Sequence, residues 1–289
     1  MKDLKKSQLK DLKKDLNAED KLEQLVIDFA IRKTSGSRED LDGVFYSKNG
    51  RHVLMASKSL KGSYTVCEGT RDIDSDAFWG CAYLEEITLP EGIETIGHEA
   101  FGRCISLREI KIPSTVVKLG TNPFIEIVDL KVESSSDYVV SDGKAVFADG
   151  GKTLVSYISS DQEYKIPKGV ETIGEKAFSK NKYIKAVALP SSLKVIDDEA
   201  FFDCDSLIGI TLPSGIDQIG ACAFADCASL KKVEFSGVPA KYKRSMLSGC
   251  DNLNVILVPD GSIEKFGKLT RDFDDRVVEK KRKAPMYKK

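Results

Sequence analysis

The residues best suited to covalent or metal chemistry in this chain of 289 residues are seven cysteines. Five of them recur at equivalent places: Cys81, Cys104, Cys204, Cys227 and Cys250. A metal site needs cysteines spaced as Cys-x-x-Cys or close to a histidine, and no such spacing occurs. The recurrence favours a row of buried thiols that fill tight turns, because a free cysteine packs as a small apolar residue. Asn181 takes the same place in one copy, which fits a polar turn-filling role and argues against disulfides. We therefore expect neither a metal nor a cofactor.

The two histidines are the main candidates for acid–base catalysis. His52 falls in an expected hairpin, and His98 follows a glycine at an expected bend. A nucleophile–base pair needs the imidazole beside a hydroxyl, thiol or carboxylate in space. The repeated copy of this segment has Asp198 in place of His98, so we interpret His98 as an exposed bend residue. The sequence thus predicts that the protein is not an enzyme, and a hydrolase built around His98 is the alternative.

An alternating acidic run, Asp72, Asp74 and Asp76, raises the alternative of a calcium loop. Such a loop alternates oxygen ligands, contains a glycine turn and ends on a bidentate carboxylate. The run lacks that last ligand, and its neighbours follow the repeat described next. We interpret these aspartates as solvated bend residues.

A repeat of 23 residues positions all of these side chains. An Ala-Phe pair marks its copies: Ala77-Phe78, Ala100-Phe101, Ala177-Phe178, Ala200-Phe201 and Ala223-Phe224. The spacings between successive pairs are 23, 77, 23 and 23 residues. Relative to the alanine, cysteine recurs four positions on, aliphatic residues seven and ten positions on, and proline thirteen positions on. So many columns in phase indicate a repeat architecture in which each copy is one structural unit.

A longer period of 100 residues overlies the short one. It divides the chain into two blocks, residues 42–141 and 142–241, followed by a final partial repeat. Each block opens with apolar runs around a dipeptide that favours a tight hairpin turn, Asn49-Gly50 in the first and Asp149-Gly150 in the second. We expect a hairpin at the start of each block.

One segment of each unit reads as a short strand. In residues 84–90, Ile87 would point inward and Glu86 outward. Pro90 would end the strand, because proline has no amide proton for the next ladder. A single coil cannot bury its own inner face, whereas coils stacked ~4.8 Å apart bury a continuous core and pair their backbone edges. We therefore predict a repeat solenoid, mostly of short strands and turns, over residues 36–259.

The pattern Ala-Phe-x-x-Cys-x-x-Leu-x-x-Ile-x-Leu-Pro-x-x-Ile-x-x-Ile-Gly, as in residues 77–97, resembles the BspA-like leucine-rich repeat family. The resemblance covers residues 42–259 and includes the hairpin segments, which are similar to interruptions common in that family. It implies a right-handed leucine-rich-repeat coil that binds proteins, often on cell surfaces in host adhesion. It supplies no catalytic residues.

The two ends of the chain fall outside the repeat. Residues 1–35 read as helical, because leucines recur at helical spacing among many charged residues. We expect this segment to form an N-terminal helical cap, since the end of a solenoid leaves an apolar rung to cover. Residues 260–289 are expected to form a C-terminal cap, closed by Ile263, Phe266 and Leu269, and a basic tail.

The exposed strand face is where we expect a partner to bind, because stacked strands present regular ladders of side chains. One outward row is mostly basic and contains Arg108, Lys131, Lys185 and Lys231. The neighbouring row contains Glu86, Glu109 and Val132. Trp79 and Tyr83 add an aromatic pair able to anchor a partner, and packing of Trp79 against the preceding coil is the alternative interpretation.

Composition narrows the class of partner. The 44 basic and 45 acidic residues nearly balance, so the chain as a whole has no attraction to nucleic acid or acidic lipid. No apolar run approaches the ~18 residues of a membrane span, and the charged N-terminus does not read as a secretory signal, so we expect a cytoplasmic location. The sequence predicts a non-enzymatic protein-binding module. The alternative is a secreted or cell-surface adhesin or carbohydrate-binding module, if an upstream signal has been removed.

Overall fold

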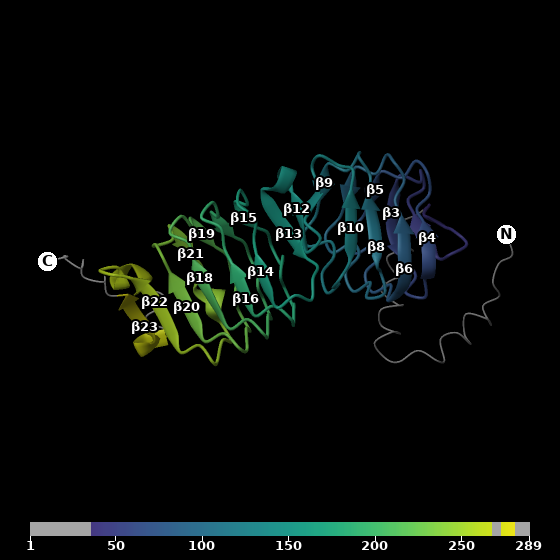
Figure 1. Cartoon of the computed structure of the whole chain (residues 1–289). Coiled ribbons are helices and arrows are strands. Elements are labelled where there is room, and N and C mark those ends of the chain that lie inside the picture. The colour runs from purple at the N-terminus through teal and green to yellow at the C-terminus, as the bar shows by residue number, and fades with distance from the viewer. Residues whose placement is uncertain (1–35, 268–272, 281–289) are drawn as a thin grey trace, which may run out of the picture.

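The computed structural model describes residues 36–267 and 273–280. Successive turns of the chain stack side by side into a β-solenoid (Figure 1). The helices whose bounds are described are short 3₁₀ turns: η1 (Asp149–Gly151), η2 (Arg244–Leu247), η3 (Ile263–Phe266) and η4 (Asp274–Arg276). The predicted solenoid of short strands and turns is therefore confirmed.

The longer strands stack into one face of the solenoid, here called the long-strand face. Its first half is a four-stranded sheet: β4 (Lys61–Thr65), β6 (Tyr83–Thr88), β8 (Glu109–Ile112) and β10 (Lys131–Ser134). Its second half is a six-stranded sheet: β14 (Glu163–Lys165), β16 (Ala186–Ala188), β18 (Gly209–Leu212), β20 (Lys232–Phe235), β22 (Val255–Pro259) and β23 (Val277–Lys280). Neighbouring strands in both sheets are parallel, as stacking of successive coils requires.

The shorter strands form a second face, here called the short-strand face. Its first sheet contains β1 (Arg38–Glu39), β2 (Val44–Tyr46), β3 (His52–Ala56), β5 (Asp72–Ile73), β7 (Thr95–Ile96) and β9 (Lys118–Leu119). Its second sheet contains β11 (Val140–Ser141), β12 (Ala145–Ala148), β13 (Thr153–Tyr157), β15 (Thr172–Ile173), β17 (Val195–Ile196), β19 (Gln218–Ile219) and β21 (Lys241–Tyr242).

Both expected hairpins are present at the start of the short-strand sheets. β2 pairs antiparallel with β3 across the Asn49-Gly50 turn, and β12 pairs antiparallel with β13 across the turn at Asp149-Gly150. Gly50 and Gly150 have φ angles of 71° and 61°, the left-handed conformation that glycine adopts without strain.

The expected inward and outward alternation is also present. In β6, Ile87 is buried while Glu86 and Thr88 are exposed. The phenylalanines of the Ala-Phe pairs form files along the interior. Ring centroids lie 5.3 Å apart for Phe78–Phe101 and 4.6 Å apart for Phe178–Phe201, with nearly parallel planes.

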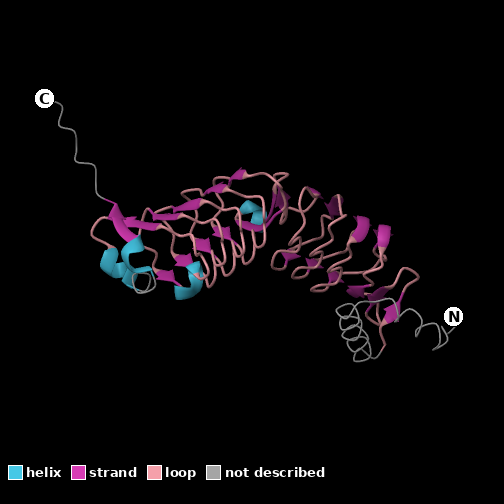
Figure 2. Cartoon of the chain, turned by 90° about the horizontal axis from the view of Figure 1, so that it is seen from below, coloured by secondary structure: helices cyan, strands magenta, loops and turns pink. Residues whose placement is uncertain are grey.

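The core is nevertheless divided in two, so the expectation of one continuous core is wrong at the middle of the molecule. The β12–β13 hairpin lies between two apolar clusters and contributes alternate residues to each. Phe147 and Leu154 belong to the second cluster, whereas Val146 and Val155 belong to the first. The physical reason is the period-two alternation of a strand, which gives this hairpin two apolar faces. The stack bends where the two halves meet (Figure 2).

The expected N-terminal helical cap, residues 1–35, lies outside the described residues, as do Leu269 and the tail from residue 281. At the C-terminal end, Phe266 in η3 is fully buried, as expected of a closing residue, while Ile263 is 39% exposed. β23 extends the long-strand ladder beyond the repeat by pairing with β22. The expected limits of the blocks remain predictions.

Candidate interaction surfaces

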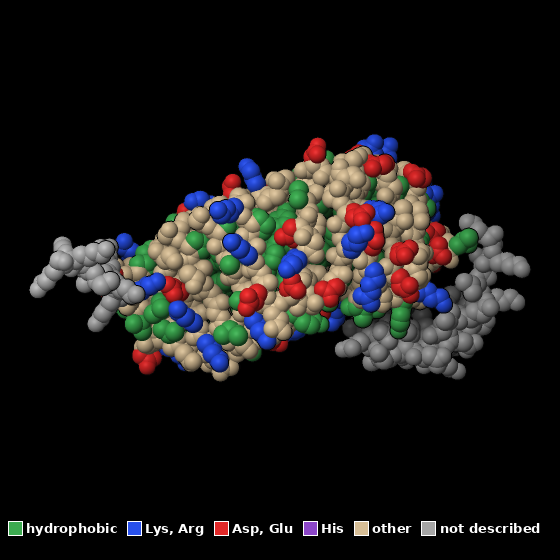
Figure 3. All heavy atoms as spheres, viewed as in Figure 1, with side chains coloured by type: hydrophobic (Ala, Val, Ile, Leu, Met, Phe, Trp, Pro, Cys, Tyr) green, Lys and Arg blue, Asp and Glu red, His purple; other side chains and the backbone are tan. Residues whose placement is uncertain are grey.

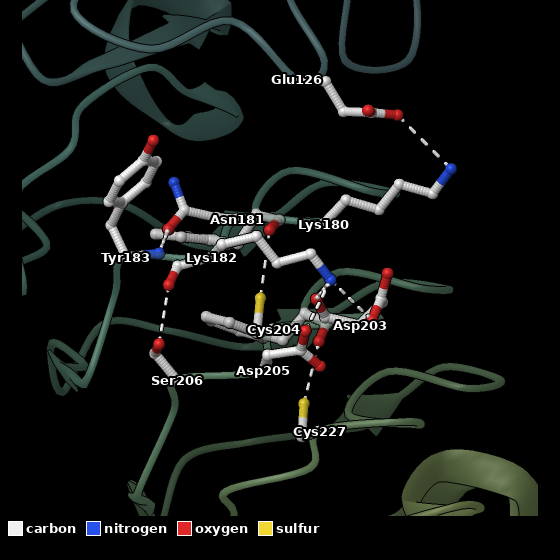
Figure 4. Close-up of polar contacts among 12 residues, drawn as sticks. Glu126, Lys180, Asn181, Lys182, Tyr183, Asp203, Cys204, Asp205, Ser206 and Cys227 are labelled. Carbon is white, nitrogen blue, oxygen red and sulfur yellow. Dashed lines mark hydrogen bonds and ion pairs between the residues drawn. The ribbon is translucent and has the colours of Figure 1, made fainter.

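The cysteine column lies inside the solenoid and holds neighbouring coils together. Each thiol lies within hydrogen-bonding distance of a backbone oxygen of the preceding coil: Cys81 to Ser57, Cys104 to Phe78, Cys204 to Phe178, Cys227 to Phe201 and Cys250 to Phe224. Asn181 fills the same place, donating from Nδ2 to the Ser159 oxygen at 3.3 Å. Figure 4 draws it with the thiols of Cys204 and Cys227. All seven cysteines are free thiols. The column therefore consists of packing residues that bond between coils.

Burial opposes ionisation of these thiols. It raises the pKa of Cys227 to about 12 and that of Cys250 to about 11, because a thiolate loses its hydration in an apolar interior. A nucleophilic cysteine needs the opposite shift. The column is thus unsuited to nucleophilic chemistry.

The basic row expected on the long-strand face is not continuous, because Lys131 lies out of register with Arg108. β10 pairs with β8 so that Lys131 lies opposite Glu109 and Val132 opposite Ile110. Val132 is only 7% exposed, so the expectation that it points outward is wrong. The cause is visible in the sequence: a single residue separates Leu130 from Val132, whereas two residues separate Leu107 from Ile110.

This register places Lys131 in a charged ladder. Its Nζ lies 3.4 Å from Glu109 Oε2 and 2.5 Å from Glu133 Oε1, and Lys111 Nζ lies 3.7 Å from Glu133 Oε2. Glu133 raises the pKa of Lys131, and Lys131 in turn lowers that of Glu133, by charge-assisted hydrogen bonding. Glu86 is the next residue of the same ladder, opposite Glu109 on β6. Acidic and basic side chains intermingle on the side of Figure 3 where β6, β8 and β10 lie.

Lys185 and Lys231 form a separate row with Ile208 in the second half of the face. The Ile208 amide donates to the Lys185 oxygen at 3.1 Å, and the Lys231 amide donates to the Ile208 oxygen at 2.8 Å, so the three are consecutive rungs. All three are exposed. The residues beside Lys185 and Ile208 are small, namely Ala186, Ala188, Gly209 and Thr211, whereas Lys232 and Glu234 form an ion pair beside Lys231. The long-strand face is therefore free of large side chains around β16 and β18, with Lys185 and Lys231 on either side of Ile208.

Trp79 and Tyr83 play different parts. A Cβ atom added to Gly102 would lie 2.2 Å from Trp79 Cε3, so the indole packs over that glycine. Trp79 therefore contacts the following coil. Its packing against the preceding coil stays a prediction. Tyr83 is 67% exposed at the start of β6. Arg108 is also exposed, and its Nη1 lies 3.4 Å from the Ile105 oxygen.

A groove on the short-strand face escaped the sequence analysis. It has a volume of about 510 Å³ and is lined by both histidines of the chain, by Asp72 and Asp74, and by Phe45 among other apolar residues. His52 Nδ1 lies 3.2 Å from Asp74 Oδ1 and 3.6 Å from Asp72 Oδ2. The expectation that the aspartates are solvated agrees with their part exposure, 30% and 38%. The 23-residue spacing predicts that the coils stack in register. It does not predict that the β2–β3 hairpin forms one side of a groove next to these coils.

Other proteins share this architecture. The model of a family described as BspA type Leucine rich repeat region matches six copies over residues 71–152 and 151–270. None of the curated proteins compared with the chain matches it.

Solved structures resemble it as well. A leucine rich cell surface protein from Faecalibacterium prausnitzii is 27% identical, with a TM-score of 0.53 over 72% of this chain. This chain spans 62% of that protein's length. The pneumococcal vaccine antigen PcpA has a TM-score of 0.55 at 19% identity, covering 78% of this chain and 69% of the antigen. A leucine-rich repeat protein from Eubacterium ventriosum has a TM-score of 0.52 at 20% identity, covering 78% of this chain and 77% of the other.

The expected cytoplasmic location is not supported by these similarities, since the Faecalibacterium protein is described as a cell surface protein. Within the part of the chain that the structure describes, no helix has the length and apolar character to cross a bilayer.

Proposed function

Because the chain belongs to the BspA-type leucine-rich-repeat family, we propose that it is a non-enzymatic module that binds another protein through its long-strand face. The row Lys185–Ile208–Lys231 carries the proposal. Ile208 is 48% exposed between two cations, beside a surface of alanine, glycine and threonine that leaves room for a partner's side chains. Protein interfaces combine an apolar centre with a polar rim, and the position of Ile208 between two lysines on stacked strands supports that arrangement here.

Arg108, Lys131, Glu86, Glu109 and Tyr83 belong to the proposed surface as its first half. Their ladder of alternating charges would set the orientation of a partner more than its affinity, because exposed ion pairs contribute little free energy. Trp79, which packs over Gly102 in the turn before β6, is the remaining residue of the proposed surface.

Affinity capture with the full chain as bait tests the proposal. Lys185→Glu combined with Lys231→Glu should reduce the capture of its specific partners at least tenfold. The matched control is Lys194→Glu with Lys241→Glu, two exposed lysines on the side of the short strands, which should leave capture unchanged. Equal capture by both double variants would contradict a role for the long-strand face.

We also propose a cell-surface location, which the description of the Faecalibacterium protein supports. Surface biotinylation of intact producing cells should label the protein, and labelling only after lysis would contradict that location. The carbohydrate-binding alternative, with a glycan as partner, remains a prediction from sequence that a glycan array tests.

A further inference from the structure

The groove on the short-strand face has an apolar wall and an acidic floor. Phe45 on β2 and Leu54 and Met55 on β3 line one side, and all three are half-buried. Asp72 on β5 and Asp74 just beyond it form the acidic floor beside that wall, and His98 and Lys118 line the groove farther along the sheet, toward β9. Leu41, in the turn before β2, is fully exposed at the same end of the molecule.

The second half of the molecule shows what covers the same wall of its own hairpin. The two hairpins can be superposed by their pairing, because Val44 pairs with Ala56 in the first and Ala145 pairs with Tyr157 in the second. In this superposition Phe45 corresponds to Val146, and Leu54 corresponds to Val155. Val146 and Val155 are 0% and 8% exposed, because the coils of the first half pack against them. This wall of the hairpin therefore accepts a polypeptide in the second half, and it faces an open groove in the first.

The acidic floor distinguishes the first hairpin from the second. Asp72 and Asp74 correspond to Thr172 and Gly174, which carry no charge. His52 lies between the two carboxylates, but a single Nδ1 proton can be donated to only one of them. The floor therefore keeps carboxylate oxygens available for a cation, and a lysine or arginine side chain presents several donors that suit carboxylates.

We propose that this groove binds a peptide segment of a partner protein in which a lysine or arginine accompanies an aliphatic side chain. The cation would pair with Asp72 and Asp74, and the aliphatic side chain would cover Phe45, Leu54 and Met55. The occupant is a polypeptide because the corresponding wall in the second half is covered by one, and it is basic because the floor is acidic. The site is separate from the long-strand face, so either proposal can fail alone.

Fluorescence anisotropy with the full chain tests this groove. The probes are three labelled hexapeptides in which a leucine lies one, two or three positions from a lysine. At least one should bind, and the same peptide with glutamate in place of lysine should not. Absence of binding by all three, or equal binding of the glutamate peptide, would overturn the proposal.

Variants assign the binding to the groove. Asp72→Asn with Asp74→Asn should raise the Kd at least tenfold. Glu171→Gln with Asp217→Asn removes the same charge from the second half and should leave the Kd within twofold of the wild type. Leu54→Gln should weaken binding, whereas Leu41→Gln should not. Unchanged binding by the Asp72/Asp74 variant, with its thermal unfolding midpoint preserved, would refute the assignment.

Discussion

At the scale of single residues, Asn181 shows how one side chain can replace another in a repeat. Its Nδ2 donates to the Ser159 oxygen of the preceding coil, the same kind of contact that the cysteine thiols make. Its Oδ1 also accepts from the amides of Tyr183 and Ile184 at 3.0 and 2.9 Å. In the repeats that have cysteine, a backbone oxygen is the acceptor for the equivalent amide. For example, the Leu107 amide donates to the Cys104 backbone oxygen. Asparagine therefore makes more hydrogen bonds at this position than cysteine does.

We expect Asn181→Ala to lower the free energy of unfolding by about 1–3 kcal/mol, because buried backbone amides lose their acceptor. Asn181→Cys should cost less, since a thiol restores the contact with Ser159. Urea denaturation of the three proteins measures the difference. An alanine variant as stable as the wild type would show that the amide side chain contributes nothing to stability.

The register of Lys131 marks where residue-level prediction succeeded and where it failed. The columns of alanine, phenylalanine and cysteine predicted which side chains are buried, because a buried position tolerates few residue types. Surface columns carry no such signal. The sequence shows that the segment between Leu130 and Val132 is one residue shorter than in the other repeats, but the outward rows alone did not reveal this shortening. Aligning the strands on Ile110 and Val132, the buried residues within β8 and β10, places Lys131 opposite Glu109. Aligning them on the alanine of each repeat does not.

At the scale of elements, the closeness of neighbouring coils depends on glycine at the bend. A Cβ atom on Gly97 would lie 2.5 Å from the Ser75 amide nitrogen, and one on Gly120 would lie 2.3 Å from that of His98. Gly174 occupies the same column but follows the hairpin, and its nearest neighbour would be the Leu154 oxygen at 3.1 Å. The bend is therefore tightest where one repeat coil rests on another.

Gly97→Ala should accordingly lower the free energy of unfolding by about 1–3 kcal/mol, as expected for overpacking against backbone. Gly174→Ala should cost less than half as much, because the carbonyl it meets is farther away. Thermal or chemical denaturation compares the two. Equal losses would show that the intrinsic preference of the bend for glycine, and not the spacing of the coils, decides the effect.

At the scale of the whole molecule, the joint between the halves combines ion pairs with unsatisfied polar atoms. Lys176 Nζ lies 2.8 Å from Glu99 Oε1, and Lys180 Nζ lies 3.4 Å from Glu126 Oε1 (Figure 4). Asn122 Oδ1 and Ser156 Oγ are buried without a hydrogen-bond partner among the described residues. Asn122 Nδ2 nonetheless donates across the joint to the Lys176 oxygen at 2.6 Å. The joint is therefore where we expect the two halves to separate first, because a buried polar atom without a partner costs free energy.

Stacked repeats are coupled mainly through contacts with their neighbours, so weakening the joint should separate the unfolding of the two halves. Glu99→Gln with Asn122→Ala should broaden the urea transition and lower its apparent m-value. The matched control is Glu94→Gln with Ser114→Ala, which removes a carboxylate charge and a polar side chain from within the first half. A transition as steep as that of the wild type would show that the halves unfold as one cooperative unit despite the division of the core.

The sequence predicted the solenoid and both hairpins but not the division between them. The apolar residues of the β12–β13 hairpin alternate as they would in any strand buried on both faces. Nothing in that alternation shows that one face meets the coils before it and the other the coils after it. The groove of the first half depends on the same property, because only the folded chain reveals which hairpin wall is covered.

The inter-coil sulfhydryl contacts leave no thiol of the cysteine column in a disulfide. Every cysteine is reduced, and the five that line the coils bond to carbonyl groups and not to one another. No disulfide bond therefore contributes to the stability of the folded state. Folding of such a chain requires neither an oxidant nor a disulfide isomerase, because no disulfide has to form.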